Sequence, residues 1–216
     1  MNNDQVAACR LYLITPPTFE PEAFAKTLDD AIEGGNVACV QLRMTETDGD
    51  GLAAAARILI PLCQARDIAF LIDGRADIAR DVGADGVHLA RPGDVENARR
   101  FLGAEAIVGV SAGGSRHNAM LAAEAGADYV SFGACHPSAT LPNAHVIEPD
   151  ILAWWNETML LPSVAVGGID AANAAALVVM GTDFLAVCHS VWSAPDGPRA
   201  AVAALNKSMD SSQQGK

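Results

Sequence analysis

Two short motifs place a carboxylate beside a glycine near the end of an apolar run. Asp73-Gly74 closes the run AFLID, and Gly93-Asp94 follows the run DGVHLA by a few residues. Glycine allows a sharp turn and a close approach of the backbone to a ligand, and a carboxylate can hold a cation or move a proton. Both motifs are therefore candidate positions for chemistry.

Gln41 and Arg43 stand two positions apart at the end of the run VACVQLR. Alternate residues of a strand point to the same face, so the amide and the guanidinium are expected side by side. The permanently charged fork of arginine suits a phosphate or a carboxylate, although a salt-bridged arginine at the rim is the alternative. Ser111, which follows the run AIVGV, could donate to a ligand oxygen.

A glycine pair, Gly167-Gly168, ends the run SVAV, and Cys188-His189 ends the next run, FLAV. In barrels of alternating strands and helices, the loops after the last two strands often bind phosphate through backbone N–H groups. We therefore expect these four residues to form a phosphate site, with an ordinary tight turn as the alternative.

Histidines follow several of the apolar runs: His88, His136, His145 and His189. Together with Cys135 and Cys188 they have no recognised spacing of zinc ligands, so no metal centre is expected from them. His88 is interpreted as a hydrogen-bonded structural residue. His136 is the acid–base candidate, because its loop ACHPSATLPNAH is long; a plain loop histidine is the alternative.

Eight short apolar runs alternate with alanine-rich stretches of helical length. Their continuous hydrophobicity is typical of parallel strands buried on both faces. The expected strands are 10–15, 37–43, 69–73, 85–90, 106–111, 128–133, 163–168 and 183–188. This alternation predicts a single (β/α)8 TIM barrel over residues 1–208, with a doubly wound open sheet as the alternative. Residues 209–216 are expected to form a disordered tail.

Three of the expected strands begin with an aspartate, in VGADGVHL, AGADYVSF and MGTDFLAV. Asp85, Asp128 and Asp183 therefore repeat at the start of βα units, far from the ends that carry function. We interpret them as turn-forming residues at the bottom of the barrel.

Net charge, cysteine content and the lengths of apolar runs limit the kinds of partner and compartment that we expect. The formal net charge of −12 disfavours nucleic acid, whereas backbone amides can still bind a small anion. Five cysteines without a C-x-x-C motif favour a reducing compartment, and neither a signal peptide nor a transmembrane run is evident. We therefore expect a cytoplasmic protein with no membrane partner.

An ordered set of motifs resembles the superfamily of thiamine phosphate synthase and thiazole tautomerase. The motifs are VQLR, LIDGRADIARDVGADGVHL, IVGVSA, AGADYVSFG, VAVGGI and GTDFLAV, which together span about residues 10–193. The resemblance implies a TIM barrel that couples a thiazole phosphate to hydroxymethylpyrimidine pyrophosphate with Mg²⁺. Together with the strand-end positions, it leads us to expect substrate binding by Gln41, Arg43, Asp73, Ser111, Thr140, Gly167, Gly168, Cys188 and His189 and catalysis by Arg43 and Ser111, with His136 added as the acid–base candidate from its loop. The resemblance also allows a homodimer.

The chain departs from the family pattern where the pyrophosphate and the metal would bind. The two metal aspartates of the family correspond to Gly74 and Gly93, and an asparagine of the family corresponds to Asp73. Asp73 and Asp94 could replace the metal ligands only if their loops shifted by one residue. Two family lysines correspond to Thr45 and Leu141.

Three functions are consistent with these residues. The first is a thiamine phosphate synthase-like protein with an intact thiazole-phosphate half and an eroded pyrophosphate half, for which Mg²⁺ matters only if coupling is retained. The second is a metal-independent thiazole tautomerase-like isomerase that uses His136, although the family histidine corresponds to Ala134. The third is a non-catalytic binder of a small phosphorylated heterocycle.

Overall fold

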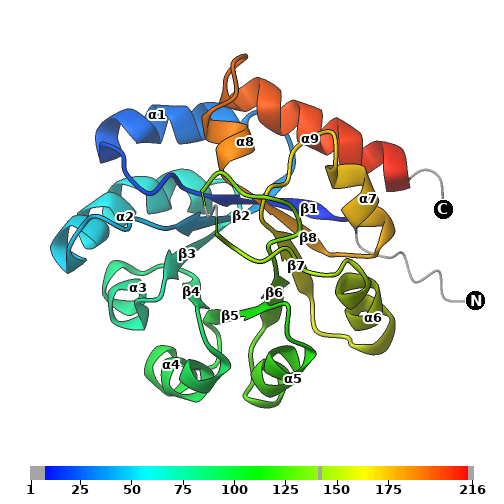
Figure 1. Ribbon diagram of the computed structural model, residues 1–216. Helices are drawn as coiled ribbons and strands as arrows, with labels where there is room; N and C mark the ends of the chain where they lie inside the picture. The colour runs from blue at the N-terminus through cyan, green and yellow to red at the C-terminus, as the bar shows by residue number, and fades with distance from the viewer. Residues whose placement is uncertain (1–7, 141–142, 214–216) are drawn as a thin grey trace, which may run out of the picture.

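The computed structural model describes residues 8–140 and 143–213 and consists of one closed barrel of eight parallel strands (Figure 1). Neighbouring strands pair in sequence order, and β8 pairs with β1. The strands are β1 Arg10–Ile14, β2 Val37–Leu42, β3 Ala69–Asp73, β4 Gly86–Leu89, β5 Ile107–Gly113, β6 Tyr129–Phe132, β7 Ser163–Val166 and β8 Phe184–Val187. The expected TIM barrel is confirmed, and the open sheet is excluded.

Helices follow the strands and surround the barrel (Figure 1). Their bounds are α1 Pro21–Ile32, α2 Gly49–Gln64, α3 Ala76–Val82, α4 Val95–Leu102, α5 Arg116–Glu124, α6 Asp150–Thr158, α7 Ala174–Val179, α8 His189–Trp192 and α9 Pro198–Gln213, with a 3₁₀ turn, η1, at Pro92–Asp94. Among the described residues, no helix is long and apolar enough to cross a membrane.

The main core lies between the strands and the helices. Large side chains such as Trp155, Phe70 and Phe132 are fully buried there, and Ala55 and Ala56 of α2 are fully buried with them. Small residues on a helix allow it to approach a sheet closely, so the barrel can be closely packed although few residues are aromatic. A second, smaller cluster of buried residues includes Tyr12 and Tyr129.

The three repeated aspartates lie at the amino-terminal edge of the barrel, as expected. Each carboxylate accepts a hydrogen bond from a backbone N–H of the preceding strand. The acceptor and donor pairs are Asp85 with Phe70 at 2.7 Å, Asp128 with Val108 at 2.7 Å, and Asp183 with Ser163 at 2.8 Å. These bonds connect neighbouring strands and stabilise the end of the barrel opposite the candidate site.

Removal of one such carboxylate should destabilise the fold. In Asp183→Ala the N–H of Ser163, a fully buried residue, loses its acceptor, and we expect the free energy of unfolding to fall by about 1–3 kcal/mol. Urea denaturation measures this change. The matched control is Asp81→Ala, which breaks an exposed ion pair with Arg80 and should change stability by less than about 0.5 kcal/mol. Equal effects of the two substitutions would contradict the interpretation.

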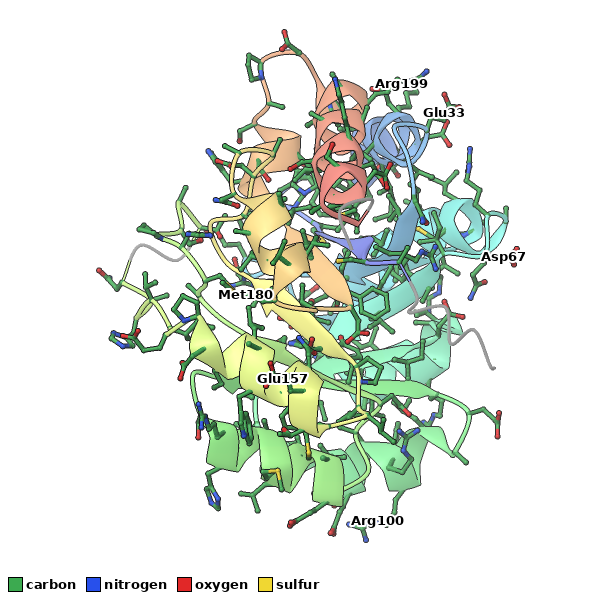
Figure 2. The ribbon with its side chains drawn as sticks, turned by 90° about the vertical axis from the view of Figure 1, so that its right-hand side faces the viewer. Glu33, Asp67, Arg100, Glu157, Met180 and Arg199 are labelled. Carbon is green, nitrogen blue, oxygen red and sulfur yellow. The ribbon has the colours of Figure 1, made fainter. Side chains whose placement is uncertain are left out.

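The carboxyl-terminal helix is longer than the sequence indicated. Helix α9 continues to Gln213, whereas the domain was expected to end at residue 208 and a disordered tail to follow. Met209 is buried and continues the face formed by Val202 and Leu205, so residues 209–213 belong to a packed helix. Figure 2 shows α9 beside α1, where Arg199 and Glu33 form an ion pair. Residues 1–7 and 214–216 lie outside the described part.

Candidate active site

Two adjoining cavities open at the carboxyl ends of the strands. The first, here called the barrel cavity, has a volume of about 260 Å³ and extends into the barrel interior down to Tyr12 and Tyr129. The second, here called the loop cup, has a volume of about 210 Å³ and lies among the loops after β6, β7 and β8. Arg43 lines both cavities, so a ligand that occupies both would contact its guanidinium.

The loop cup brings together the residues expected to bind phosphate. Its lining includes Thr140, Gly167, Gly168, Cys188 and His189. Both glycines have positive φ, +99° and +64°. A Cβ at position 168 would lie 2.4 Å from the carbonyl oxygen of Pro137, so the loop after β7 can pack against the loop after β6 only with glycine there. Ser190, which the sequence did not single out, also lines the cup, and its enclosed hydroxyl has no hydrogen-bond partner among the described residues.

The barrel cavity holds the other expected residues. Gln41, Asp73 and Ser111 line it together with Arg43. His88 also lines it, and its two ring nitrogens lie 2.8 Å from the Tyr129 hydroxyl and 3.0 Å from Ser111 Oγ. The prediction that His88 is hydrogen-bonded is therefore confirmed.

Tyr12, Tyr129 and Ser131 also line the barrel cavity but were missed in the sequence. A tyrosine within an apolar strand usually indicates core packing, which is why neither was singled out. A signal was nevertheless present, because the chain has only two tyrosines and both occur in expected strands. Buried tyrosine hydroxyls require polar partners, so a pair of tyrosines in strands points to a polar barrel interior.

Burial shifts the protonation equilibria of the cavity. Desolvation, and next the positive charge of Arg43, lower the pKa of His88 to about 4, so the imidazole is neutral at pH 7. Desolvation raises the pKa of the Asp73 carboxyl, while Arg43 and the hydrogen bond from Gln41 act in the opposite direction. Desolvation also raises the pKa of both tyrosines, so both hydroxyls keep their protons.

The lowered pKa of His88 predicts a loss of stability in acid. The unfolded chain binds a proton at His88 near pH 6.5 but the folded chain only near pH 4, so stability falls as the pH falls between these values. The shift corresponds to about 3 kcal/mol. Urea unfolding at pH 7 and pH 4 should show a smaller loss for His88→Asn than for the wild type. His117→Asn, at an exposed position, is the control and should match the wild type.

Arg43 is the cation of the site. No other described residue forms a hydrogen bond or an ion pair with its guanidinium, in contrast to Arg91 and Arg99, which pair with aspartates. Its backbone is fixed instead, because its N–H donates to the Thr15 hydroxyl at 2.9 Å. An unpaired guanidinium between two cavities is available for an anionic ligand.

His136 does not join the other candidates. Its side chain lines neither cavity, and its enclosed Nε2 has no hydrogen-bond partner within residues 8–140 and 143–213. Its backbone N–H donates to the carbonyl of Gly167 at 3.0 Å, which fixes the loop after β6 against the cup. The structure thus gives His136 a place in the wall behind the cup and does not bring it together with Arg43 and Ser111.

Asp73 and Asp94, the possible substitutes for the family's two metal aspartates, do not line the same cavity. Asp73 lines the barrel cavity and accepts a hydrogen bond from Gln41, whereas Asp94 lines neither cavity and pairs with Arg91 at 3.0 Å. Within the described ranges, no three His, Cys, Asp or Glu side chains lie close enough to hold a metal. Gly74 and Gly93 have open space where a Cβ would stand. Thr45 also lines neither cavity, and Leu141 lies outside the described residues.

Comparison with known proteins decides the family. The family model described as thiamine monophosphate synthase matches residues 11–191. The chain belongs to this family. It is 52% identical over 202 residues to a thiamine-phosphate synthase of Rhodospirillum centenum, covering 93% of this chain and 98% of the relative. It is 44% identical to the thiamine-phosphate synthase of Hyphomonas neptunium, covering 94% of each chain.

Solved structures agree with the family. The thiamine phosphate pyrophosphorylase of Pyrococcus furiosus superposes with a TM-score of 0.82 at 32% identity, covering 94% of this chain and 96% of that chain. A 3-hexulose-6-phosphate synthase superposes with a TM-score of 0.66 at 20% identity, which shows a shared fold only. The sequence motifs and the barrel fold therefore both agree with the synthase family.

Proposed function

We propose that this protein joins a thiazole phosphate to hydroxymethylpyrimidine pyrophosphate to give thiamine phosphate, and that it does so slowly. The observation that carries the proposal is the unpaired guanidinium of Arg43 where the barrel cavity meets the loop cup. A coupling enzyme must hold two substrates against each other, and both carry phosphate groups. One cation at the junction can contact either of them.

The loop cup is proposed to hold the thiazole phosphate. Its glycine-rich loop allows a phosphate to approach the backbone at Gly167 and Gly168, and such loops bind anions whatever the net charge of the protein. The barrel cavity then remains for the pyrimidine. Gln41 and Ser111 supply its polar groups.

In the reaction the bond between the pyrimidine methylene carbon and the pyrophosphate oxygen breaks, and the oxygen leaves with the electron pair. The thiazole nitrogen then donates its lone pair to the same carbon. The leaving pyrophosphate gains negative charge, which Arg43 would stabilise. Among the described residues, Asp73 is the one carboxylate that lines the barrel cavity. The family resemblance places two metal carboxylates and a lysine at the positions of Gly74, Gly93 and Thr45. Slow departure of pyrophosphate follows, because little of its charge is neutralised.

The tautomerase-like alternative receives no support from geometry. It requires an acid–base group next to the bound thiazole, and His136 lines neither cavity. A non-catalytic binder would share the cup and would differ from a slow synthase only in the absence of product.

Thiazole phosphate binding tests the cup. In Gly168→Ala the new methyl group would meet the backbone of the loop after β6, so we expect the dissociation constant, measured by calorimetry, to rise at least about tenfold, or about 1.4 kcal/mol. Gly197→Ala is the matched control: φ there is also positive, at +86°, but the surroundings are open. It should bind as the wild type does. Equal binding by the wild type and both variants would contradict the assignment of the cup.

A further inference from the structure

Seven polar side chains form one continuous chain of hydrogen bonds beneath the barrel cavity. The bonds join Asp73 to Gln41 at 2.7 Å, Gln41 to Tyr12 at 2.8 Å, Tyr12 to Tyr129 at 3.0 Å, Tyr129 to His88 at 2.8 Å, His88 to Ser111 at 3.0 Å and Ser111 to Ser131 at 3.4 Å. Asp73 stands on β3 and Ser111 on β5, and both side chains line the cavity. The chain therefore connects two parts of the cavity wall through the barrel interior.

Proton counting gives the first half of this chain a single direction. The Asp73 carboxylate can only accept, so the Gln41 amide turns its NH₂ group to Asp73 and its oxygen to Tyr12. The one hydroxyl proton of Tyr12 is then committed to Gln41. The contact between the two tyrosines must consequently use the proton of Tyr129.

The second half of the chain follows from the first. Tyr129 has no proton left for His88, so Nδ1 of His88 must carry the proton and donate to the tyrosine oxygen. A neutral imidazole carries only one such proton, so Nε2 accepts from the Ser111 hydroxyl. Ser111 then has only lone pairs to offer to the cavity.

We propose that Asp73 is a positioning residue that makes Ser111 a hydrogen-bond acceptor toward the ligand, by fixing the tautomer of His88 through Gln41, Tyr12 and Tyr129. The ligand class favoured at Ser111 is a heterocycle that presents an N–H donor, such as a ring amino group. This reverses the sequence-based expectation that Ser111 donates to a ligand oxygen. It rests on the proposed function only in naming a heterocycle as the ligand.

The direction of these hydrogen bonds depends on the carboxylate of Asp73, a residue in which this protein departs from the family pattern. The family resemblance places an asparagine at position 73, and an asparagine can either donate to Gln41 or accept from it. With an amide at both position 41 and position 73, every hydrogen bond of the series could point in either direction. The acid at position 73 removes that freedom.

The packing around Tyr129 keeps the chain in place. Gly109 of β5 leaves the space that the tyrosine ring occupies, since a Cβ there would lie 1.9 Å from Tyr129 Cζ. The imidazole of His88 stacks on the same ring, with centroids 5.7 Å apart and planes inclined by 19°. Gln41, Tyr12, Tyr129 and His88 are all buried. Water therefore has little access to replace these contacts.

The test is the tautomer of His88 in the free, full-length protein, read from nitrogen NMR spectra of histidine-labelled material at pH 7. The wild type should show a protonated Nδ1 and an unprotonated Nε2, with the resonances assigned by comparison with His88→Asn. Asp73→Asn, which keeps the size of the side chain, should lose this exclusive state and show Nε2 protonation in part or in full. Asp77→Asn, which alters an exposed ion pair with Arg75, is the control and should match the wild type.

A wild-type His88 protonated at Nε2 would overturn the proposal, and so would an Asp73→Asn spectrum identical to that of the wild type. A second variant tests the same proposal at a different residue of the series. Tyr129→Phe removes the acceptor of Nδ1–H and should also release the tautomer. No substrate is present in these spectra, so a failure here is distinct from a failure to couple the two substrates.

Discussion

Arg43→Gln is expected to weaken the binding of inorganic pyrophosphate about a hundredfold. A forked, charge-assisted pair of hydrogen bonds contributes about 3 kcal/mol in total, and every 1.4 kcal/mol is a factor of ten in affinity. Among the described residues Arg43 is the arginine that lines both cavities, so no neighbouring guanidinium would compensate. Isothermal titration calorimetry with pyrophosphate measures the change.

Two comparisons make this result specific. Arg43→Lys keeps the charge and loses the planar fork, so its affinity should lie between those of the wild type and Arg43→Gln. Arg91→Gln removes an exposed arginine that pairs with Asp94 outside both cavities, and it should leave binding unchanged. If Arg91→Gln weakened binding as much as Arg43→Gln, general electrostatics would explain the effect and the placement of the anion would be wrong.

The double substitution Gly74→Asp and Gly93→Asp is expected to raise Mg²⁺-dependent coupling by about a hundredfold. A bound metal contributes several kcal/mol to stabilisation of developing phosphate charge. Both positions have open space for a Cβ, and only Gly74 has a positive φ, +67°, a conformation that aspartate tolerates better than most residues. The strain at that position should cost about 1 kcal/mol of stability.

The matched control for the double substitution is Gly74→Asn with Gly93→Asn, which adds side chains of the same size without charge. It should show no gain in rate at any Mg²⁺ concentration. Initial rates of thiamine phosphate formation, measured over a range of Mg²⁺ concentrations, give the comparison. An equal gain in both double variants would mean that loop packing, and not metal binding, limits the reaction.

The fold was predictable because each strand carries its own signal. Apart from Gln41 the run VACVQL is apolar, every residue of it is buried, and its place between two alanine-rich stretches indicates a parallel strand. Gln41, Arg43, Asp73 and Ser111 lie at or just beyond the ends of such strands, and because the barrel fixes strand ends, their common place in the barrel cavity could be anticipated. Their roles in binding and catalysis stay predictions. A disordered tail from residue 209 was expected because the residues around Met209 are polar and chain ends often fray. Helix α9 instead continues to Gln213, with the Met209 side chain buried.

The orientation of loop side chains could not be predicted from the sequence. His136 follows a strand in a long loop, but its position depends on contacts with Gly167 and Gly168, which are distant in the chain. Tyr12 and Tyr129 were missed for a related reason. A single tyrosine in a strand indicates only burial, whereas the contact between their hydroxyls arises from the closure of the barrel.

Slow coupling is tested most directly by thiamine phosphate formation with the purified wild-type protein. Both substrates and Mg²⁺ are supplied at saturating concentrations, product is detected by fluorescence after oxidation, and a family member with aspartates at the positions of Gly74 and Gly93 serves as the reference. We expect turnover above the no-enzyme control but at least about a hundredfold below the reference. Turnover equal to the reference would show that the pyrophosphate half of the site is fully functional, and a complete absence of product would show that the protein does not couple the two substrates; either result would contradict the proposal of a slow synthase.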